Sequence, residues 1–103
     1  MRNEAVIGGR LLKRGALRYT PAGIPLIDFV IGHSSMQVEA GIRRKLQCEF
    51  EATAVGELAV RMETFKLNQT LQVTGFLARN RIGNRRTMLR ATKIEMAAAN
   101  GNE

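Results

Sequence analysis

The residues best suited to chemistry in this sequence are basic, and they are densest in the segment ARNRIGNRRTMLRATK, residues 78–93. This segment contains no acidic residue, and Gly83 and Asn84 at its centre are typical of a turn. Arginine offers a planar set of N–H donors that matches phosphate groups and base edges. The pattern therefore favours a hairpin that binds a polyanion. Its basic residues are Arg79, Arg81, Arg85, Arg86, Arg90 and Lys93.

Two further basic clusters occur in this chain, which has 16 Lys and Arg against 9 Asp and Glu and a net charge of +7. Segregated positive charge favours a nucleic acid partner, because each neutralised phosphate releases condensed counterions. An anionic membrane is the weaker interpretation, since the sequence shows no basic amphipathic helix. The first cluster is Arg10, Lys13, Arg14 and Arg18, and the second is Arg43, Arg44 and Lys45.

The sequence lacks the residue patterns of an enzyme, a metal site or a cofactor site. His33 is the only histidine and has no titratable neighbour at the spacing of a catalytic dyad, so we interpret it as structural or solvated. Glu49 and Glu51 share one strand face, which is typical of a solvated surface. The pair Gly8 and Gly9 lacks the spacing of a phosphate-binding loop and suits a strand bend or bulge. We expect a binding protein without catalysis, metal or cofactor.

The length of 103 residues suits a single domain with one core, which we place at residues 1–97, followed by a frayed tail at 98–103. Cys48 is the only cysteine, so no intrachain disulfide can form, and we expect it to pack in the core of a protein in a reducing cytoplasm. Neither a signal peptide nor an apolar segment of membrane-spanning length is found. We therefore expect a soluble protein that is not exported.

Alternating apolar residues predict short strands separated by loops rich in Gly, Pro or polar residues. Leu58, Met62 and Phe65 recur at helical spacing and predict an amphipathic helix of about nine residues. This order is typical of an all-β, five-stranded Greek-key OB-fold barrel with one short helix between strands three and four. In such a barrel we expect the three basic clusters to line one groove. The predicted strands are 4–13, 26–34, 42–55, 70–79 and 85–96, with loops at 15–25 and near 36–41.

The predicted third strand separates two faces by chemistry. One face should enter the core, whereas the other should be basic at its beginning and acidic at its end. The expected core residues are Leu46, Cys48, Phe50, Ala52 and Ala54. The expected outer residues are Arg43, Lys45, Gln47, Glu49 and Glu51.

Aromatic residues that could stack on bases are scarce, because the chain has no Trp. Phe29, Phe50 and Phe65 are expected in the core. Tyr19 in the first loop is the best stacking candidate. Phe76 either faces outward with its neighbours in the strand or lies inside if a bulge occurs at Gly75. Binding should therefore depend on Arg and be sensitive to salt.

Four segments carry a resemblance over residues 3–96: RYTPAGIPLIDFVIGHSS, EAGIRRKLQCEF, LQVTGFLARNR and KIEM. The sequence resembles the bacterial primosomal replication protein N family, small OB-fold relatives of single-stranded DNA-binding protein. The resemblance implies a non-enzymatic homodimer that binds single-stranded DNA when collapsed replication forks restart. It also implies contacts with the primosomal helicase PriA and with a helicase-loading primosome protein.

The same resemblance implies particular binding positions. Arg18 matches a basic residue of the first loop, Arg44 one of the third strand, and the arginines of residues 79–86 match the basic loop between strands four and five. Ser34 and Gln47 depart from the family, which has a basic residue and a stacking tryptophan there. With the basic clusters and Tyr19, these matches complete our candidate set. The candidate nucleic-acid-binding residues are Arg18, Tyr19, Arg43, Arg44, Lys45, Arg79, Arg81, Arg85 and Arg86.

We therefore predict a DNA-binding accessory protein of the replication-restart primosome with little sequence preference. Two alternatives share the charge pattern. One is an RNA-binding OB module, and the other is an interaction protein whose basic face docks on an acidic partner. A small enzyme is a more distant alternative.

Overall fold

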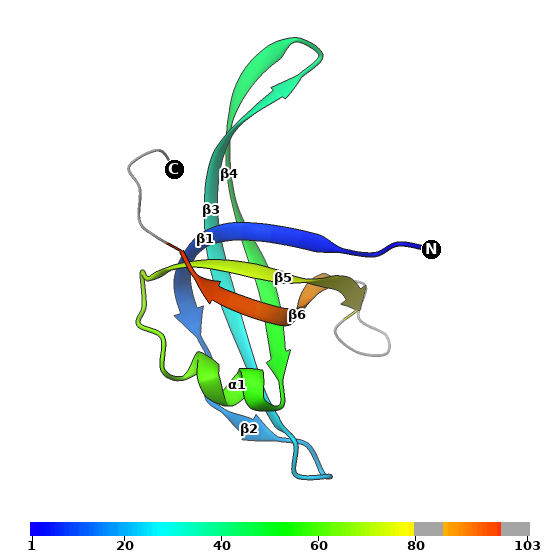
Figure 1. Ribbon diagram of the computed structural model, residues 1–103, viewed down its shortest axis with the longest axis vertical. Coiled ribbons are helices and arrows are strands. Elements are labelled where there is room, and N and C mark those ends of the chain that lie inside the picture. Colours follow the sequence, from blue (N-terminus) through cyan, green and yellow to red (C-terminus); the bar gives the residue numbers. More distant parts are fainter. Residues whose placement is uncertain (80–85, 98–103) are drawn as a thin grey trace.

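A computed structural model describes residues 1–79 and 86–97 of the chain (Figure 1). Strands dominate this part of the chain, and none of its helices is long and apolar enough to cross a membrane. The elements are β1 (Ala5–Arg14), β2 (Arg18–Tyr19), β3 (Pro25–Glu39), β4 (Ile42–Val55), α1 (Glu57–Met62), β5 (Thr70–Arg79) and β6 (Thr87–Met96).

Five strands close into a barrel, and β2 adds a short strand beside β3. The strand order is β1-β5-β6-β4-β3-β2, and an additional β1–β3 pairing closes the ring. The β4–β6 pairing is parallel, whereas the other pairings are antiparallel. The helix α1 follows β4 and precedes β5. The expected all-β OB-fold barrel, with one short helix between the third and fourth barrel strands, is confirmed.

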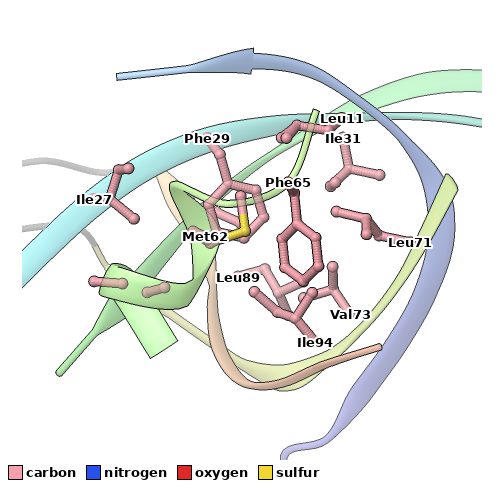
Figure 2. Packing of buried hydrophobic residues seen from close by; sticks show 13 residues of the cluster. Leu11, Ile27, Phe29, Ile31, Met62, Phe65, Leu71, Val73, Leu89 and Ile94 are labelled. Atoms are coloured by element: carbon pink, nitrogen blue, oxygen red, sulfur yellow. The ribbon is translucent and has the colours of Figure 1, made fainter. Parts of the chain in front are cut away.

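The barrel interior is filled by apolar side chains that alternate along the strands and by residues at and just after α1. Ile27 and Ile31 of β3 are fully buried, and so are Leu71 and Val73 of β5. Figure 2 shows the side chains of α1 and the turn after it among those of the strands. Burial of each large side chain stabilises the fold by about 1.5–3 kcal/mol, so this cluster holds the elements in place.

The helix α1 is shorter than predicted, with six residues instead of about nine. After Met62 the chain continues in tight turns, because Thr64 N–H donates to the Arg61 carbonyl at 2.9 Å and Phe65 N–H to the Met62 carbonyl at 3.3 Å. Such bonds over three residues still place Phe65 in the core, where it is 5% exposed. The predicted burial of Met62 and Phe65 is therefore confirmed, although the helix ends at Met62.

The predicted loop near residues 36–41 is wrong. The second predicted strand continues as β3 to Glu39 and pairs with β4 along its full length. A two-residue turn, Ala40 and Gly41 with φ of 52° and 76°, joins the two strands. The result is a long hairpin whose distal part projects from the barrel (Figure 1).

The same projection corrects the predicted core face of β4. Ala52 and Ala54 are fully buried as expected. Leu46 is 42% exposed, however, and Cys48 and Phe50 are only half-buried. Phe50 lies beside fully buried Ile31 at the end of the core, and Cys48 and Leu46 follow it toward the projecting end of the hairpin.

Two glycines allow neighbouring strands to approach closely. A Cβ at Gly9 would lie 2.3 Å from the Gly32 carbonyl oxygen, and one at Gly75 would lie 2.1 Å from the Arg90 carbonyl oxygen. The register of β1 against β3 shifts between Leu11 and Lys13 rather than at the glycine pair, where the sequence suggested a bend or bulge. Gly9 therefore provides close approach and not the register shift.

The glycine pair of β1 supplies a first prediction. Gly9→Ala should destabilise the fold by about 1–3 kcal/mol, because its Cβ would overlap the β3 backbone. Gly8→Ala is the matched control, since its Cβ would meet its nearest atom at 3.9 Å. Gly8→Ala should leave the free energy of unfolding unchanged or raise it by up to about 1 kcal/mol. Urea denaturation measures both, and a larger loss for Gly8→Ala would contradict the role given to the close approach.

Candidate nucleic-acid interface

The outer face of β3 and β4 forms the floor of the candidate site. Cross-strand pairing places Asp28 beside Thr53, Val30 beside Glu51, and Gly32 beside Glu49. The parallel β4–β6 pairing extends the first row from Thr53 to Arg90. Three hollows lie along this surface, and each is named below by its acidic residue.

The Asp28 hollow lies between β2, β3, β4 and β6. Asp28 accepts hydrogen bonds from the Arg18 guanidinium at 3.0 Å and from the Thr53 hydroxyl at 2.8 Å. Arg90 is half-buried there, and its guanidinium has no hydrogen-bond or ion-pair partner in the described part of the chain. The hollow therefore contains one arginine held by a carboxylate and one available to a ligand. Its lining is Arg18, Thr20, Leu26, Asp28, Thr53, Val55 and Arg90.

The Glu51 hollow lies next along the floor and shares Asp28 with the first. Arg86 forms an ion pair with Glu51 across it. Lys13 of β1 lines the opposite side. Basic residues from two distant segments thus border a hollow that contains two carboxylates, Asp28 and Glu51. The lining is Lys13, Gly15, Asp28, Phe29, Val30, Glu51, Arg86 and Met88.

The Glu49 hollow is bordered by β1, β3 and β4. His33 links two of these strands, since its Nδ1–H donates to the Gly8 carbonyl at 2.7 Å while Nε2 contacts the Ser35 hydroxyl at 2.7 Å. Within residues 1–79 and 86–97, no three His, Cys, Asp or Glu side chains are grouped to hold a metal ion. The lining is Arg10, Leu12, Gly32, His33, Ser34, Gln47, Cys48 and Glu49.

Three residues of the first basic cluster lie on the surface with the hollows, whereas the fourth stabilises the fold. Arg10, Lys13 and Arg18 line the hollows. Arg14 instead is half-buried, and its guanidinium donates to the carbonyl oxygens of Met62, at 3.2 Å, and of Phe65. Arg14 therefore satisfies carbonyl groups at the end of α1, where unpaired acceptors accumulate.

None of the residues of the second cluster lines one of the three hollows, and the expectation of one groove for all three clusters stays a prediction. Arg43, Arg44 and Lys45 lie on the distal hairpin that projects from the barrel (Figure 1). At about 3.3 Å per residue, Lys45 is roughly 7 Å and Arg43 roughly 13 Å along β4 from Gln47, which lines the Glu49 hollow. Arg44 pairs with Glu39 at 3.5 Å. The predicted change from a basic to an acidic outer face along β4 is nevertheless seen.

The third cluster is described only in part. Arg86 and Arg90 line the hollows, whereas Arg79 is exposed at the end of β5. The candidates Arg81 and Arg85, together with the predicted turn at Gly83 and Asn84, lie outside the described residues.

The two aromatic candidates occupy different faces. Tyr19 is 63% exposed, but it pairs with Pro25, whereas its neighbour Arg18 pairs with Leu26 of the Asp28 hollow. Alternation therefore turns Tyr19 away from that hollow. Phe76 is 37% exposed and faces outward, which decides between the two orientations that the sequence left open.

Sequence reasoning missed several residues of this surface as site residues. Asp28 and Thr53 lie inside apolar strands and gave no signal of their own. Arg90 belonged to the basic segment but was not selected. Cross-strand pairing places Asp28, Thr53 and Arg90 in one row. The sequence does not reveal this row, because it does not give the register of the strands.

Comparison with known proteins identifies the family. A profile described as another single-strand binding protein family matches residues 3–93. The replication restart protein PriB of Nitrosomonas europaea is 38% identical over 95 residues, which cover 90% of this chain and 88% of that protein. The chain belongs to the replication restart protein PriB family. The PriB of Bordetella pertussis is 40% identical over 76 residues, 74% of this chain and 71% of that protein.

Solved structures agree with this assignment to the PriB family. PriB from Ralstonia solanacearum superposes with a TM-score of 0.88 at 26% identity, covering 95% of this chain and all of that one. The single-stranded DNA-binding protein from Thermus aquaticus superposes with a TM-score of 0.78 at 22% identity, covering 97% of this chain and 52% of that one. The second likeness concerns the fold alone. The names of these relatives describe binding and restart proteins, in agreement with the expectation of a protein that is not an enzyme.

The division of the first cluster gives a second prediction. Arg14→Met should destabilise the fold by about 2 kcal/mol, because two carbonyl groups lose a charged donor. Arg10→Met, on the same strand, should change stability by less than about 0.5 kcal/mol, since Arg10 is exposed. Urea denaturation of both variants measures the difference. Equal losses would show that the contacts of Arg14 do not stabilise the helix end.

Proposed function

We propose that this protein binds single-stranded DNA without catalysis and with little sequence preference, as an accessory of the replication-restart primosome. The observation that carries the proposal is the convergence of basic side chains on the outer face of β3 and β4. They approach from β1 and β2 on one side and from β6 and the segment before it on the other. The converging residues are Arg10, Lys13, Arg18, Arg86 and Arg90.

The carboxylates of the floor give this binding its mechanism. Asp28 holds Arg18, and Glu51 holds Arg86, so each guanidinium stays extended over the surface. Exposed ion pairs contribute only about 0–1 kcal/mol, so a DNA phosphate can replace the carboxylate at little cost. Phosphates would then follow the basic borders, and binding would release counterions.

Salt dependence tests the electrostatic mechanism. For the wild type, a plot of log K against log salt should have a slope of several units, at about −0.7 per phosphate contacted. Arg90→Gln should weaken binding and make the slope less negative by about 0.7, because it removes one phosphate contact. Fluorescence anisotropy of a labelled oligonucleotide at several salt concentrations measures both quantities.

Lys66→Gln is the matched control for the same change of charge. Lys66 lies in the loop between α1 and β5, in a separate hollow lined by residues 64–69 and Met96. Lys66→Gln should leave both the oligonucleotide affinity and the slope of the salt dependence close to those of the wild type. A wild-type slope near zero would overturn the electrostatic mechanism, and an equal effect of both variants would remove the proposed site.

The family supports a protein partner as well. We propose a homodimer that contacts the primosomal helicase and a helicase-loading protein in the cytoplasm. The projecting hairpin is the surface we assign to the helicase, because Arg43 and Lys45 lie there beside exposed Met36 and Val38, and none of these residues lines a hollow. Basic and apolar groups together suit an acidic, partly apolar partner surface. Analytical ultracentrifugation tests the dimer.

A double charge reversal separates the two surfaces. Arg43→Glu with Lys45→Glu should lower helicase affinity at least tenfold, because like charges then face the partner. Its oligonucleotide affinity should fall by less than about threefold, since neither residue lines a hollow. Arg90→Gln should show the opposite pattern, which makes each variant the control for the other. A loss of DNA binding in the hairpin variant with helicase binding intact would refute this division.

A further inference from the structure

We infer that Phe76 and Arg90 form a subsite for one nucleotide, with the base stacked on the Phe76 ring and its phosphate bound by the Arg90 guanidinium. This inference rests on the proposed binding of single-stranded DNA. It adds an aromatic contact that the basic residues alone do not supply. The ligand is a nucleotide within a strand, recognised by the π face of any base.

Pairing between strands places the two residues side by side. Phe76 of β5 is the register partner of Arg90 of β6, and Arg90 is the partner of Thr53 of β4. Neighbouring strands lie about 4.8 Å apart, so Phe76 is next to Arg90 on the outer face of the sheet. Phe76 therefore lies one strand beyond Arg90, which lines the Asp28 hollow.

The backbone beside Phe76 is packed tightly. The β5–β6 register shifts between Thr74 and Gly75, and a Cβ at Gly75 would lie 2.1 Å from the Arg90 carbonyl oxygen. Gly75 thus lets β5 press against β6 at this point. The orientation of Phe76 relative to Arg90 is consequently set by the sheet and not by a loop.

Neither side chain is used elsewhere in the described structure. Phe76 is 37% exposed and takes part in no ring contact there, and Arg90 has no hydrogen-bond or ion-pair partner. The other three phenylalanine side chains have different surroundings. Phe29 and Phe65 are buried, and Phe50 packs edge-on against His33. Phe76 is the described aromatic residue that borders an unpaired arginine on the proposed DNA surface.

Single-tryptophan variants test the stacking directly, because the chain has no Trp of its own. Phe76→Trp should lose at least half of its fluorescence when a saturating oligonucleotide binds. Tyr19→Trp and Val60→Trp, both at exposed positions, are the matched controls and should be quenched by less than about a tenth. Binding of each variant is verified by anisotropy of a labelled oligonucleotide.

Affinity supplies the second readout. Phe76→Leu should weaken binding of a normal oligonucleotide roughly 5- to 100-fold, the range for one stacked base. It should leave unchanged the affinity for an oligomer of abasic sites, which has the same phosphates and no bases. Phe76→Tyr should restore binding of the normal oligonucleotide. Because Phe76 is exposed, these variants are expected to fold.

The outcomes distinguish this subsite from the function on which it rests. If the wild type binds no oligonucleotide, the proposed function and the subsite both fall. If the wild type binds, but Phe76→Trp is not quenched and Phe76→Leu binds normally, only the subsite is refuted. Quenching of Tyr19→Trp in place of Phe76→Trp would move the stacking contact to the other face.

Discussion

Closure of the barrel depends on β1 pairing with two strands in succession. Its first half pairs with β5 and its second half with β3, so the strand must bend over the core between them. Gly9 lets it pass the Gly32 carbonyl at a distance that a side chain would prevent. Every basic residue that β1 contributes to the outer surface is placed by this double pairing.

The surface that results is not uniformly positive. Carboxylates lie on its floor and basic groups at its borders, and two of the carboxylates form ion pairs across it. Such pairs are weak in water, and in this structure they place the guanidinium groups of Arg18 and Arg86 beside the floor. A floor of this kind favours exchange of one anion for another, and it allows Asp28, Glu49 and Glu51 to lie on the surface proposed to bind DNA.

Residues of one type have separate roles here because their surroundings differ. Arg14 binds carbonyl groups at the end of α1, the Arg90 side chain lies in a hollow without a partner among the described residues, and Arg43 lies on a projecting hairpin. A count of basic residues per segment cannot distinguish these roles. The same holds for the aromatic residues, among which exposure and strand face, and not sequence position, decide which could meet a base.

The sequence by itself determined the strand periodicity, the place of the helix, the OB-fold order and the family. These depend on local alternation and on motifs that persist along the chain. Only the tertiary structure decided that residues 36–39 belong to a strand, that Leu46 is exposed and that the basic residues 43–45 lie on a projecting hairpin. Alternation tells which face a residue occupies, but an opposing wall must exist for that face to be buried. Whether such a wall exists, and which strand lies beside which, depends on pairing between residues far apart in the chain.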